Sequence, residues 1–363
     1  MANMTDFTGF NFNPEELKAL REVIGEEVFN MKALTDNHVI EQGIDYKQQI
    51  VFAGRMGMFT KKLKTGNDAC EVNEADAIQF TEKVWDPEKF EGRLVHCSAT
   101  VDAQNKLINQ FTQLNPDFFN KIDASGEGAE LARFLLAAAT GALQEEIPWK
   151  AWFSDKNADL VGNGGVFTDA EVLDFVNVIE GFWKQIEEEI GAGDKNYIEI
   201  AKNSESTASA QELADNEGLD ILRKMWKGAD KRLKRMNDKQ LLVTDTIYDN
   251  LLSTFEDRQA NGGILTRLEN GGGLSFRGVE VKSMAEEWDV FIDAHMTDEN
   301  GVAHQPHRAL LTTKSNIPVG TTSTNDLTKL DAFYDKKSKT NNIDAIYNLD
   351  AKFLESYLAV AAY

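Results

Sequence analysis

The last third of the chain, residues 239–363, carries its densest pattern of apolar and polar positions. An apolar run at 241–243 predicts a strand, and apolar residues at helical spacing from Ile247 to Phe255 predict a helix directly after it. Other short runs, bounded by glycine and polar residues, predict further strands. These are 274–281, 288–292 and 308–313, with an apolar ending at 354–363.

The first residues predict a loose leader and one amphipathic helix. Asn13 is a suitable N-cap and Pro14 suits the first helical position. Leu17, Leu20 and Ile24 then form an apolar stripe at helical spacing. Because one helix cannot bury such a stripe alone, we expect it to contact the body of its own chain or a neighbouring subunit.

Residues 45–100 differ from the segments around them. Glycines interrupt an apolar and basic stretch, an acidic segment follows, and a β-prone run at 92–100 ends the region. We interpret the region as a long β-hairpin or extended loop. A loop of this length in a compact domain is typical of a functional or intermolecular excursion.

The middle of the chain predicts three helices. The first spans about 128–147 and ends at Pro148 and the aromatic residues that follow. The second begins at a capping box, Thr168 to Glu171, and carries an apolar face as far as Ile190. The third spans about 210–236, with Gly218 as the candidate point for a break. Helices, a long hairpin and then mixed strands and helices predict an α+β fold.

Opposite charges collect on two of these helices. The second predicted helix carries Glu187, Glu188 and Glu189, and the third carries Lys231, Arg232, Lys234 and Arg235. One interpretation is that both are solvated faces of a single subunit. The other is that they are complementary patches that orient neighbouring subunits.

Composition excludes several classes of function. The net charge of −22 over 363 residues argues against a protein that grips nucleic-acid backbones. Two cysteines, Cys70 and Cys97, make no disulfide framework and indicate reduced thiols in an intracellular protein. We find neither a secretory signal pattern nor an apolar run of transmembrane length.

No catalytic or metal-binding motif emerges from the sequence. The glycine clusters lack the lysine and hydroxyl residues of a phosphate-binding loop. His304 and His307 come nearest to a metal pair, but Pro306 disfavours a helix there and no further ligand completes the spacing. His96 and Cys97 alternate in a predicted strand and so face opposite sides. We therefore expect no enzyme, no cofactor and no metal site.

Several segments carry a resemblance to a known family. They are 239–252, 276–281, 288–289, 306–320 and 347–363. In these segments and in the order of its elements, the chain resembles the major capsid proteins of tailed bacteriophages, a fold shared with encapsulins and the capsid floor of herpesviruses. It is most similar to capsid proteins of phages that infect Bacteroides-like hosts. The similarity is specific over about residues 220–363.

The resemblance implies a division of the chain. We expect an N-terminal arm at 1–48 and an extended β-hairpin loop at 49–108. A peripheral domain with a long spine helix would follow at 109–240, and an axial domain at 241–329. Residues 330–363 would return to the peripheral domain.

The resemblance also implies a function. The chain would self-assemble as pentamers and hexamers into an icosahedral shell that encloses double-stranded DNA without sequence-specific binding. Its partners would be itself, a portal, a scaffold and decoration proteins, with no membrane. It would be assembled in the host cytoplasm and reside in the virion capsid. The alternatives are an encapsulin-like cellular compartment, a soluble acidic enzyme and a phage tail protein.

We expect contacts between subunits at two kinds of position. The apolar ones are Leu17, Leu20, Ile24 and Trp85. The charged ones are Glu187, Glu188, Glu189, Lys231, Arg232, Lys234 and Arg235.

Overall fold

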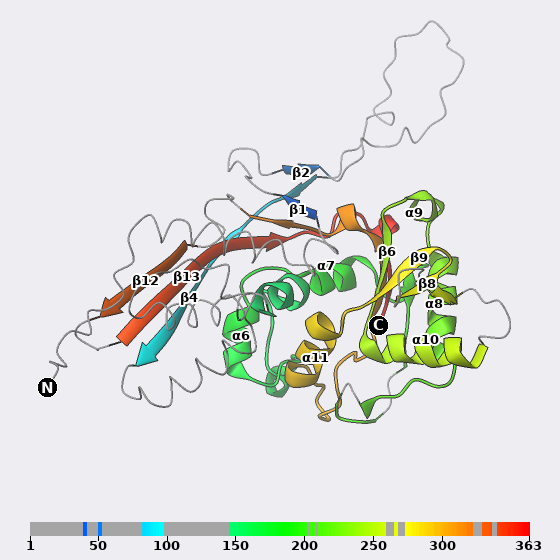
Figure 1. The fold of residues 1–363 in the computed structure, drawn as a ribbon, viewed down its shortest axis with the longest axis horizontal. Helices are drawn as coiled ribbons and strands as arrows, with labels where there is room; N and C mark the ends of the chain where they lie inside the picture. The colour runs from blue at the N-terminus through cyan, green and yellow to red at the C-terminus, as the bar shows by residue number, and fades with distance from the viewer. Residues whose placement is uncertain are drawn as a thin grey trace, which may run out of the picture.

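The computed structural model describes residues 39–41, 50–52, 82–97, 142, 145–201, 204–207, 210–258, 265–267, 273–321, 329–335 and 340–363. Within these residues, helices alternate with strands that join two larger sheets and one two-stranded pair (Figure 1). The predicted α+β fold is confirmed.

A seven-stranded sheet forms one half of the molecule, with the order β5-β14-β10-β6-β9-β8-β7. Its pairs are antiparallel except β6 with β9 and β5 with β14. The strands are β5 (Tyr197–Ile198), β6 (Lys239–Val243), β7 (Leu265–Arg267), β8 (Leu274–Phe276), β9 (Val279–Ser283), β10 (Ala309–Thr313) and β14 (Val360–Ala362).

The strands in the middle of this sheet are apolar on both faces because each face is covered. Leu242 and Leu310 pack into one core with α7 (Phe182–Glu189) and α11 (Val290–His295). Leu241 and Leu311 pack into a second core with α8 (Glu217–Gly228) and α10 (Asp245–Arg258). Since successive strand residues face opposite sides, each leucine pair divides between the two cores.

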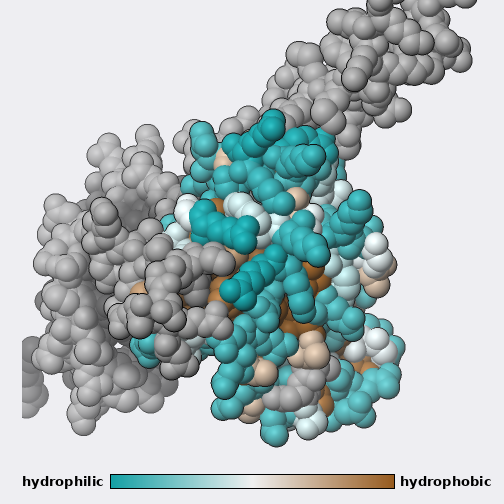
Figure 2. All heavy atoms as spheres, turned by 90° about the vertical axis from the view of Figure 1, so that its right-hand side faces the viewer, coloured by the Kyte–Doolittle hydropathy of each residue, from teal (hydrophilic) through white to brown (hydrophobic). Residues whose placement is uncertain are grey.

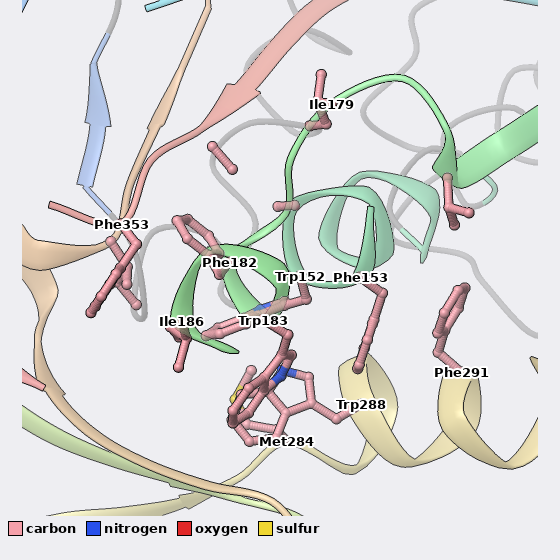
Figure 3. Packing of buried hydrophobic residues seen from close by; sticks show 14 of the residues in the cluster. Trp152, Phe153, Ile179, Phe182, Trp183, Ile186, Met284, Trp288, Phe291 and Phe353 are labelled. Carbon is pink, nitrogen blue, oxygen red and sulfur yellow. The ribbon is translucent and has the colours of Figure 1, made fainter. Parts of the chain in front are cut away.

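Three tryptophans lie at the centre of the first core (Figure 3). The ring of Trp288 lies edge-on to those of Trp152, at 4.8 Å, and Trp183, at 5.0 Å between centroids. Edge-to-face aromatic contacts of this kind add to the stabilisation from burial alone. Because the three rings come from separate elements, they join the helices on this side of the sheet to one another.

A second, five-stranded sheet is built on one long strand, β13 (Thr340–Ala351). β4 (Glu88–Cys97) pairs with it from Leu349↔Glu88 to Thr340↔Cys97, and β12 (Lys329–Asp335) pairs with its other edge. The end of β13 also pairs with β11 (Pro318–Gly320), which in turn pairs with β1 (Val39–Glu41). Figure 1 shows β4, β12 and β13 side by side, extending away from the seven-stranded half.

A separate two-stranded pair joins β2 (Ile50–Phe52) to β3 (Glu82–Val84) in antiparallel register. The residues between these two strands, which we predicted to form the rest of a hairpin, lie outside the described residues. β4 belongs to the five-stranded sheet, so the strand expected at 92–100 forms no part of the β2–β3 pair.

Two predicted helix ends are wrong. The helix described from residue 145 continues through Pro148 to Phe153, because Ile147 and Trp152 prolong its buried stripe and both are fully buried. The expected helix from 168 to 190 is divided into α6 (Ala170–Val176), whose N-cap is Asp169, and α7. The chain bends at Gly181, where any Cβ would lie 2.7 Å from the backbone nitrogen of Ser154.

Two further elements differ from the prediction. Gly218 lies inside α8, and the break comes at Asp230, whose carboxylate caps α9 (Lys231–Arg235). Residues 288–292, expected as a strand, are helical, in a π-helical segment η4 (Ala285–Asp289) that runs into α11. Trp288, Phe291 and Ile292 are buried at helical spacing, which a short apolar run cannot distinguish from a strand.

The C-terminal segment also divides. β13 lies in the five-stranded sheet, whereas β14 lies between β5 and β10 in the seven-stranded sheet. Residues 330–363 therefore do not return as one unit to a single sheet. Short 3-10 turns complete the described elements, namely η2 (Val161–Asn163), η5 (Lys314–Asn316) and η7 (Ser356–Leu358).

Candidate assembly surfaces

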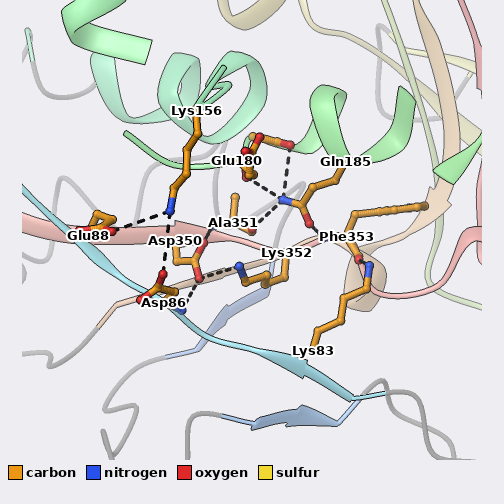
Figure 4. A network of polar contacts seen from close by, with 11 residues as sticks. Lys83, Asp86, Glu88, Lys156, Glu180, Gln185, Asp350, Ala351, Lys352 and Phe353 are labelled. Atoms are coloured by element: carbon orange, nitrogen blue, oxygen red, sulfur yellow. Dashed lines mark hydrogen bonds and ion pairs between the residues drawn. The ribbon is translucent and has the colours of Figure 1, made fainter. Parts of the chain in front are cut away.

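The chain passes from β3 into β4 through a bend at residues 85–87, which we call the junction. Trp85 is 2% exposed, so its ring anchors the bend in the body of the molecule. The backbone N–H of Asp86 donates to the carboxylate of Asp350, at 2.7 Å. The junction therefore fixes the direction in which β3 leaves the five-stranded sheet (Figure 4).

Charged side chains reinforce the junction on both sides. The ammonium of Lys83 contacts the carboxylate of Glu189 on α7 and the carbonyl of Phe353. Lys156 lies 3.9 Å from the carboxylate of Asp86 and 3.8 Å from that of Glu88. Figure 4 shows the contact of Lys83 with Phe353 and the contacts of Lys156 with Asp86 and Glu88. The orientation of β3 thus depends on elements that are distant in sequence.

Gln185 connects α7 to the end of β13. Its amide nitrogen donates to the carbonyl of Ala351 at 2.8 Å, and its amide oxygen accepts from the N–H of Phe353 at 2.9 Å. The neighbouring carboxylate of Asp350 is 2% exposed, and burial raises its pKa although Lys352, at 3.1 Å, opposes that shift. Buried polar groups that satisfy one another in this way specify a single arrangement of the backbone.

A buried ion pair lies between α7 and β10. The guanidinium of Arg308 donates to the carboxylate of Glu187 at 3.2 Å and lies 4.8 Å from the ring centroid of Trp183. Burial lowers the pKa of Arg308 and raises that of Glu187, while the attraction between the two opposes both shifts. Glu187 is therefore committed to a partner within its own chain.

A second buried cation lies between the helix at 145–153 and the five-stranded sheet. Lys150 contacts the carboxylate of Glu146 and donates to the hydroxyl of Tyr347 at 2.9 Å. Its ammonium lies over the rings of Phe90, at 4.1 Å, and Phe175, at 4.6 Å. Burial lowers the pKa of Lys150, and the Glu146 carboxylate opposes that shift. This cluster locks the helix onto β4 and β13.

We group six cations of α8, α9 and the β8–β9 turn as the basic face. None of its members forms an ion pair with another described residue, and Arg277 and Lys234 lie over the ring of half-buried Trp226, at 5.4 and 6.0 Å. The members of the basic face are Lys224, Lys227, Lys231, Lys234, Arg235 and Arg277.

The predicted contact residues fall into three groups. Leu17, Leu20 and Ile24 lie outside the described residues. Trp85 is buried within its own chain, so it offers no surface to a neighbour. Of the charged positions, three cations lie on the basic face. The others pair within the chain, as Glu187 with Arg308, Glu188 with Lys184, Glu189 with Lys83, and Arg232 with Asp230.

Arg232 thus differs from the lysines beside it. Its guanidinium lies 3.8 Å from the ring centroid of Tyr357 and donates to the carboxylate of Asp230 at 3.0 Å. It fastens α9 to the C-terminal segment. Each of the three glutamates also has a cation beside it in its own chain, and their role in contacts between subunits stays a prediction.

The described residues contain no group of three or more His, Cys, Asp or Glu side chains that could hold a metal ion. His307 is 2% exposed, its Nδ1 lies 2.7 Å from the hydroxyl of Thr246, and burial lowers its pKa to about 4. Such a histidine is a neutral core residue. No helix within the described ranges is long and apolar enough to cross a membrane.

Sequence reasoning missed the residues that hold the junction and the buried pairs. Gln185, Asp350 and Arg308 carry no local signal, because their partners are far away in sequence. For Arg308 the sequence does contain a partial signal. A charged residue directly before the apolar run 309–311 must be paired if it is buried.

No protein-family model and no curated protein matches the chain. Among solved structures, a chain of the satellite phage P4 procapsid, which includes the size determination (Sid) protein, matches with 8% identity and a TM-score of 0.48, over 95% of this chain and 98% of that one. The bacteriophage PhiM1 mature capsid matches with 10% identity and a TM-score of 0.44, over 100% and 90%. The holo-SrpI encapsulin complex from Synechococcus elongatus PCC 7942 matches with 7% identity and a TM-score of 0.43, over 99% and 91%. At these values the similarity is one of overall layout.

Proposed function

We propose that this chain is a shell-forming protein, the major capsid protein of a tailed bacteriophage. The junction is the observation that best supports this proposal. It holds an antiparallel pair, β2 with β3, in a fixed direction against a body of two sheets, by means of buried and charged side chains. We infer that a strand pair held in one direction in this way acts through its shape and its contacts with other chains rather than through catalysis.

The proposal assigns a role to each part. Residues 1–48 form an arm, and the segment around the β2–β3 pair forms the loop that overlaps a neighbour. The five-stranded sheet and the helix that ends at Phe153 form the peripheral domain. The seven-stranded sheet forms the axial domain. It includes β14, which lies within the segment 330–363 that we expected to return to the peripheral domain.

The subunits would assemble as pentamers and hexamers into an icosahedral shell around double-stranded DNA, with a portal, a scaffold and decoration proteins as partners. Assembly would take place in the host cytoplasm. The similarity to phages of Bacteroides-like hosts remains a prediction from the sequence. Many modest interfaces suffice for such a shell, because each subunit contacts several others at once.

The test is expression of the full chain, with light scattering and negative-stain microscopy. We expect capsomers, sheets, tubes or shells. A well-folded monomer under all assembly conditions contradicts the proposal. Particles purified from cells that produce the protein distinguish the nearest alternative, because a protein cargo in place of DNA indicates an encapsulin-like compartment.

Deletion of residues 1–31 tests the arm. The described residues begin at residue 39, so the core described above is retained. We expect the shortened chain to keep the thermal stability of the full chain and to lose assembly. Shells that form equally well without these residues contradict the role of the arm.

A further inference from the structure

An acidic surface, which we call the acidic face, lies on the outward side of α10. Asp245, Asp249 and Glu256 are four and seven residues apart, so they follow one side of the helix. That side is opposite the buried residues Ile247 and Leu251. None of the three acidic side chains forms an ion pair with another described residue.

The start of α10 concentrates this negative charge further. The N–H of Asp245 donates to the carboxylate of Asp289 at 3.0 Å. Burial raises the pKa of Asp289 to about 7, and the charges of Asp245 and Asp293 raise it too. The pKa of Asp249 is raised by burial and by Asp245. These carboxylates therefore lie close enough to repel one another.

α9, which carries three members of the basic face, and α10 lie at opposite ends of the half of the molecule that contains the seven-stranded sheet, and α8 lies between them and packs on α10 (Figure 1). In Figure 1, α9 is at the top of this half and α10 is at the bottom with α11. Figure 2 views this half from its right-hand side, where hydrophilic side chains dominate and hydrophobic ones are visible mainly in the gaps between them. One chain thus presents two separate surfaces of opposite charge.

We propose that the basic face of one subunit docks on the acidic face of a second copy of this chain, in a head-to-tail contact. This inference rests on the proposed self-assembly and names the surfaces that perform it. A contact between two different faces repeats from subunit to subunit and closes into a ring when the rotation allows. Charge complementarity sets the register, and Trp226 supplies an apolar contact among the cations.

A second copy fits the basic face better than the other anionic partners. Glu187, Glu188 and Glu189 are engaged within their own chain, whereas the acidic face has no ion pair with a described residue. Nucleic acid is the competing anion, but the net charge of −22 opposes its approach. A second subunit also carries a net charge of −22, so the attraction between the two faces is local and acts at short range.

The test uses two charge-reversed full-length chains. In one, Lys224→Glu and Lys227→Glu make the basic face acidic. In the other, Asp249→Lys and Glu256→Lys make the acidic face basic. All four side chains are exposed, so both chains should fold. We expect each chain alone to associate about ten-fold more weakly or worse, because like charges then meet across the contact. A one-to-one mixture should restore association, since each altered face then meets its complement.

Lys89→Glu is the control, because it reverses an exposed lysine of β4 away from both faces. It should associate as the unchanged chain does. Neutral versions, Lys→Gln and Asp→Asn or Glu→Gln at the same positions, should give a smaller loss and a weaker dependence on salt. They keep the test valid if a reversed chain does not fold.

Three outcomes overturn the inference. In the first, both reversed chains assemble as the unchanged chain does. In the second, the mixture fails to recover although each chain is folded. In the third, the basic-face chain loses binding to double-stranded DNA but keeps its self-association, which assigns that face to nucleic acid. If the unchanged chain itself never associates, the proposed function fails instead, so the two failures are distinguishable.

Discussion

The guanidinium of Arg308, 1% exposed, meets the carboxylate of Glu187 at 3.2 Å between α7 and β10. Removing one member of a buried pair leaves an uncompensated charge, which costs more than the pair contributes. We expect Arg308→Met to lower the free energy of unfolding by about 3 kcal/mol, at the low end because the Glu187 side chain keeps 31% of its exposure. Chemical denaturation of the dissociated chain measures this change.

Arg308→Met combined with Glu187→Leu should recover part of that loss, because no charge is then left buried. The exposed pair of Arg223 and Asp220 is the control, and Asp220→Asn should change stability by less than about 0.5 kcal/mol. If Arg308→Met and Asp220→Asn lower the free energy of unfolding equally, the buried pair contributes no more to stability than the exposed pair.

Asp289 makes stability depend on pH. Burial raises its folded pKa to about 7 from an ordinary value of 3.8, so between these values the folded chain binds more protons than the unfolded chain. Stability from this group is therefore greatest below pH 3.8, falls as pH rises to about 7, and is constant above it. The total loss is up to about 4 kcal/mol.

We expect Asp289→Asn to be more stable than the unchanged chain at pH 8 and to lose that advantage near pH 4. His307, with a folded pKa of about 4, acts in the opposite direction between pH 4 and 6.5, but it is present in both chains and cancels in the comparison. Denaturation midpoints across pH 4–8 provide the measurement. Parallel profiles for the two chains contradict a raised pKa at Asp289.

The hydroxyl of Tyr347 joins Lys150 and Glu146. It accepts from the Lys150 ammonium at 2.9 Å and donates to the Glu146 carboxylate at 3.0 Å. We expect Tyr347→Phe to cost about 1–2 kcal/mol of stability, while the stacking of its ring on Phe90 at 5.1 Å is kept. Tyr248→Phe, at a half-buried tyrosine of α10, should cost less than about 0.5 kcal/mol. If the two variants are equally stable, the hydroxyl of Tyr347 is dispensable.

Lys83 ties β3 to α7 and to the carbonyl of Phe353. Lys83→Met keeps the apolar stem and removes both contacts, so the junction should open more often. We expect amide hydrogen exchange at Trp85, Asp86 and Glu88 to rise about ten-fold, with little change in the seven-stranded sheet. Lys89→Met, at an exposed lysine of β4, should leave exchange unchanged. A similar rise in the exchange rate in both variants would show that the contacts of Lys83 do not hold the junction.

The parts of the fold that depend on local pattern were predictable. The strand at 241–243, the helix from residue 245 and the strand at 309–313 follow from runs and stripes of apolar residues. Tertiary packing overrode local signals elsewhere. Burial of Trp152 extends a helix past Pro148, and the backbone of Ser154 leaves room only for glycine at 181.

The candidate surfaces were less predictable than the fold. The basic residues of α9 were recognised from their spacing, but the sequence could not show that Arg232 lies on Tyr357 or that Glu187 lies beside Arg308. Those pairings are set by the topology of the sheets. Local sequence patterns do not indicate which residue, more than a hundred positions away, each of these side chains contacts.

The position of β14 has a consequence for how the chain reaches its folded state. Tyr197 of β5 pairs with Ala361, and the described residues give β5 no other strand as a neighbour. During synthesis, β5 can therefore pair with a strand only after the residues between 198 and 361 have been made. Such distant pairings slow folding, because the entropy of closing a long loop is lost before the contacts form. We therefore expect insertion of β14 to be a late step, and until it occurs the edge of β10 would be open to strands from other molecules.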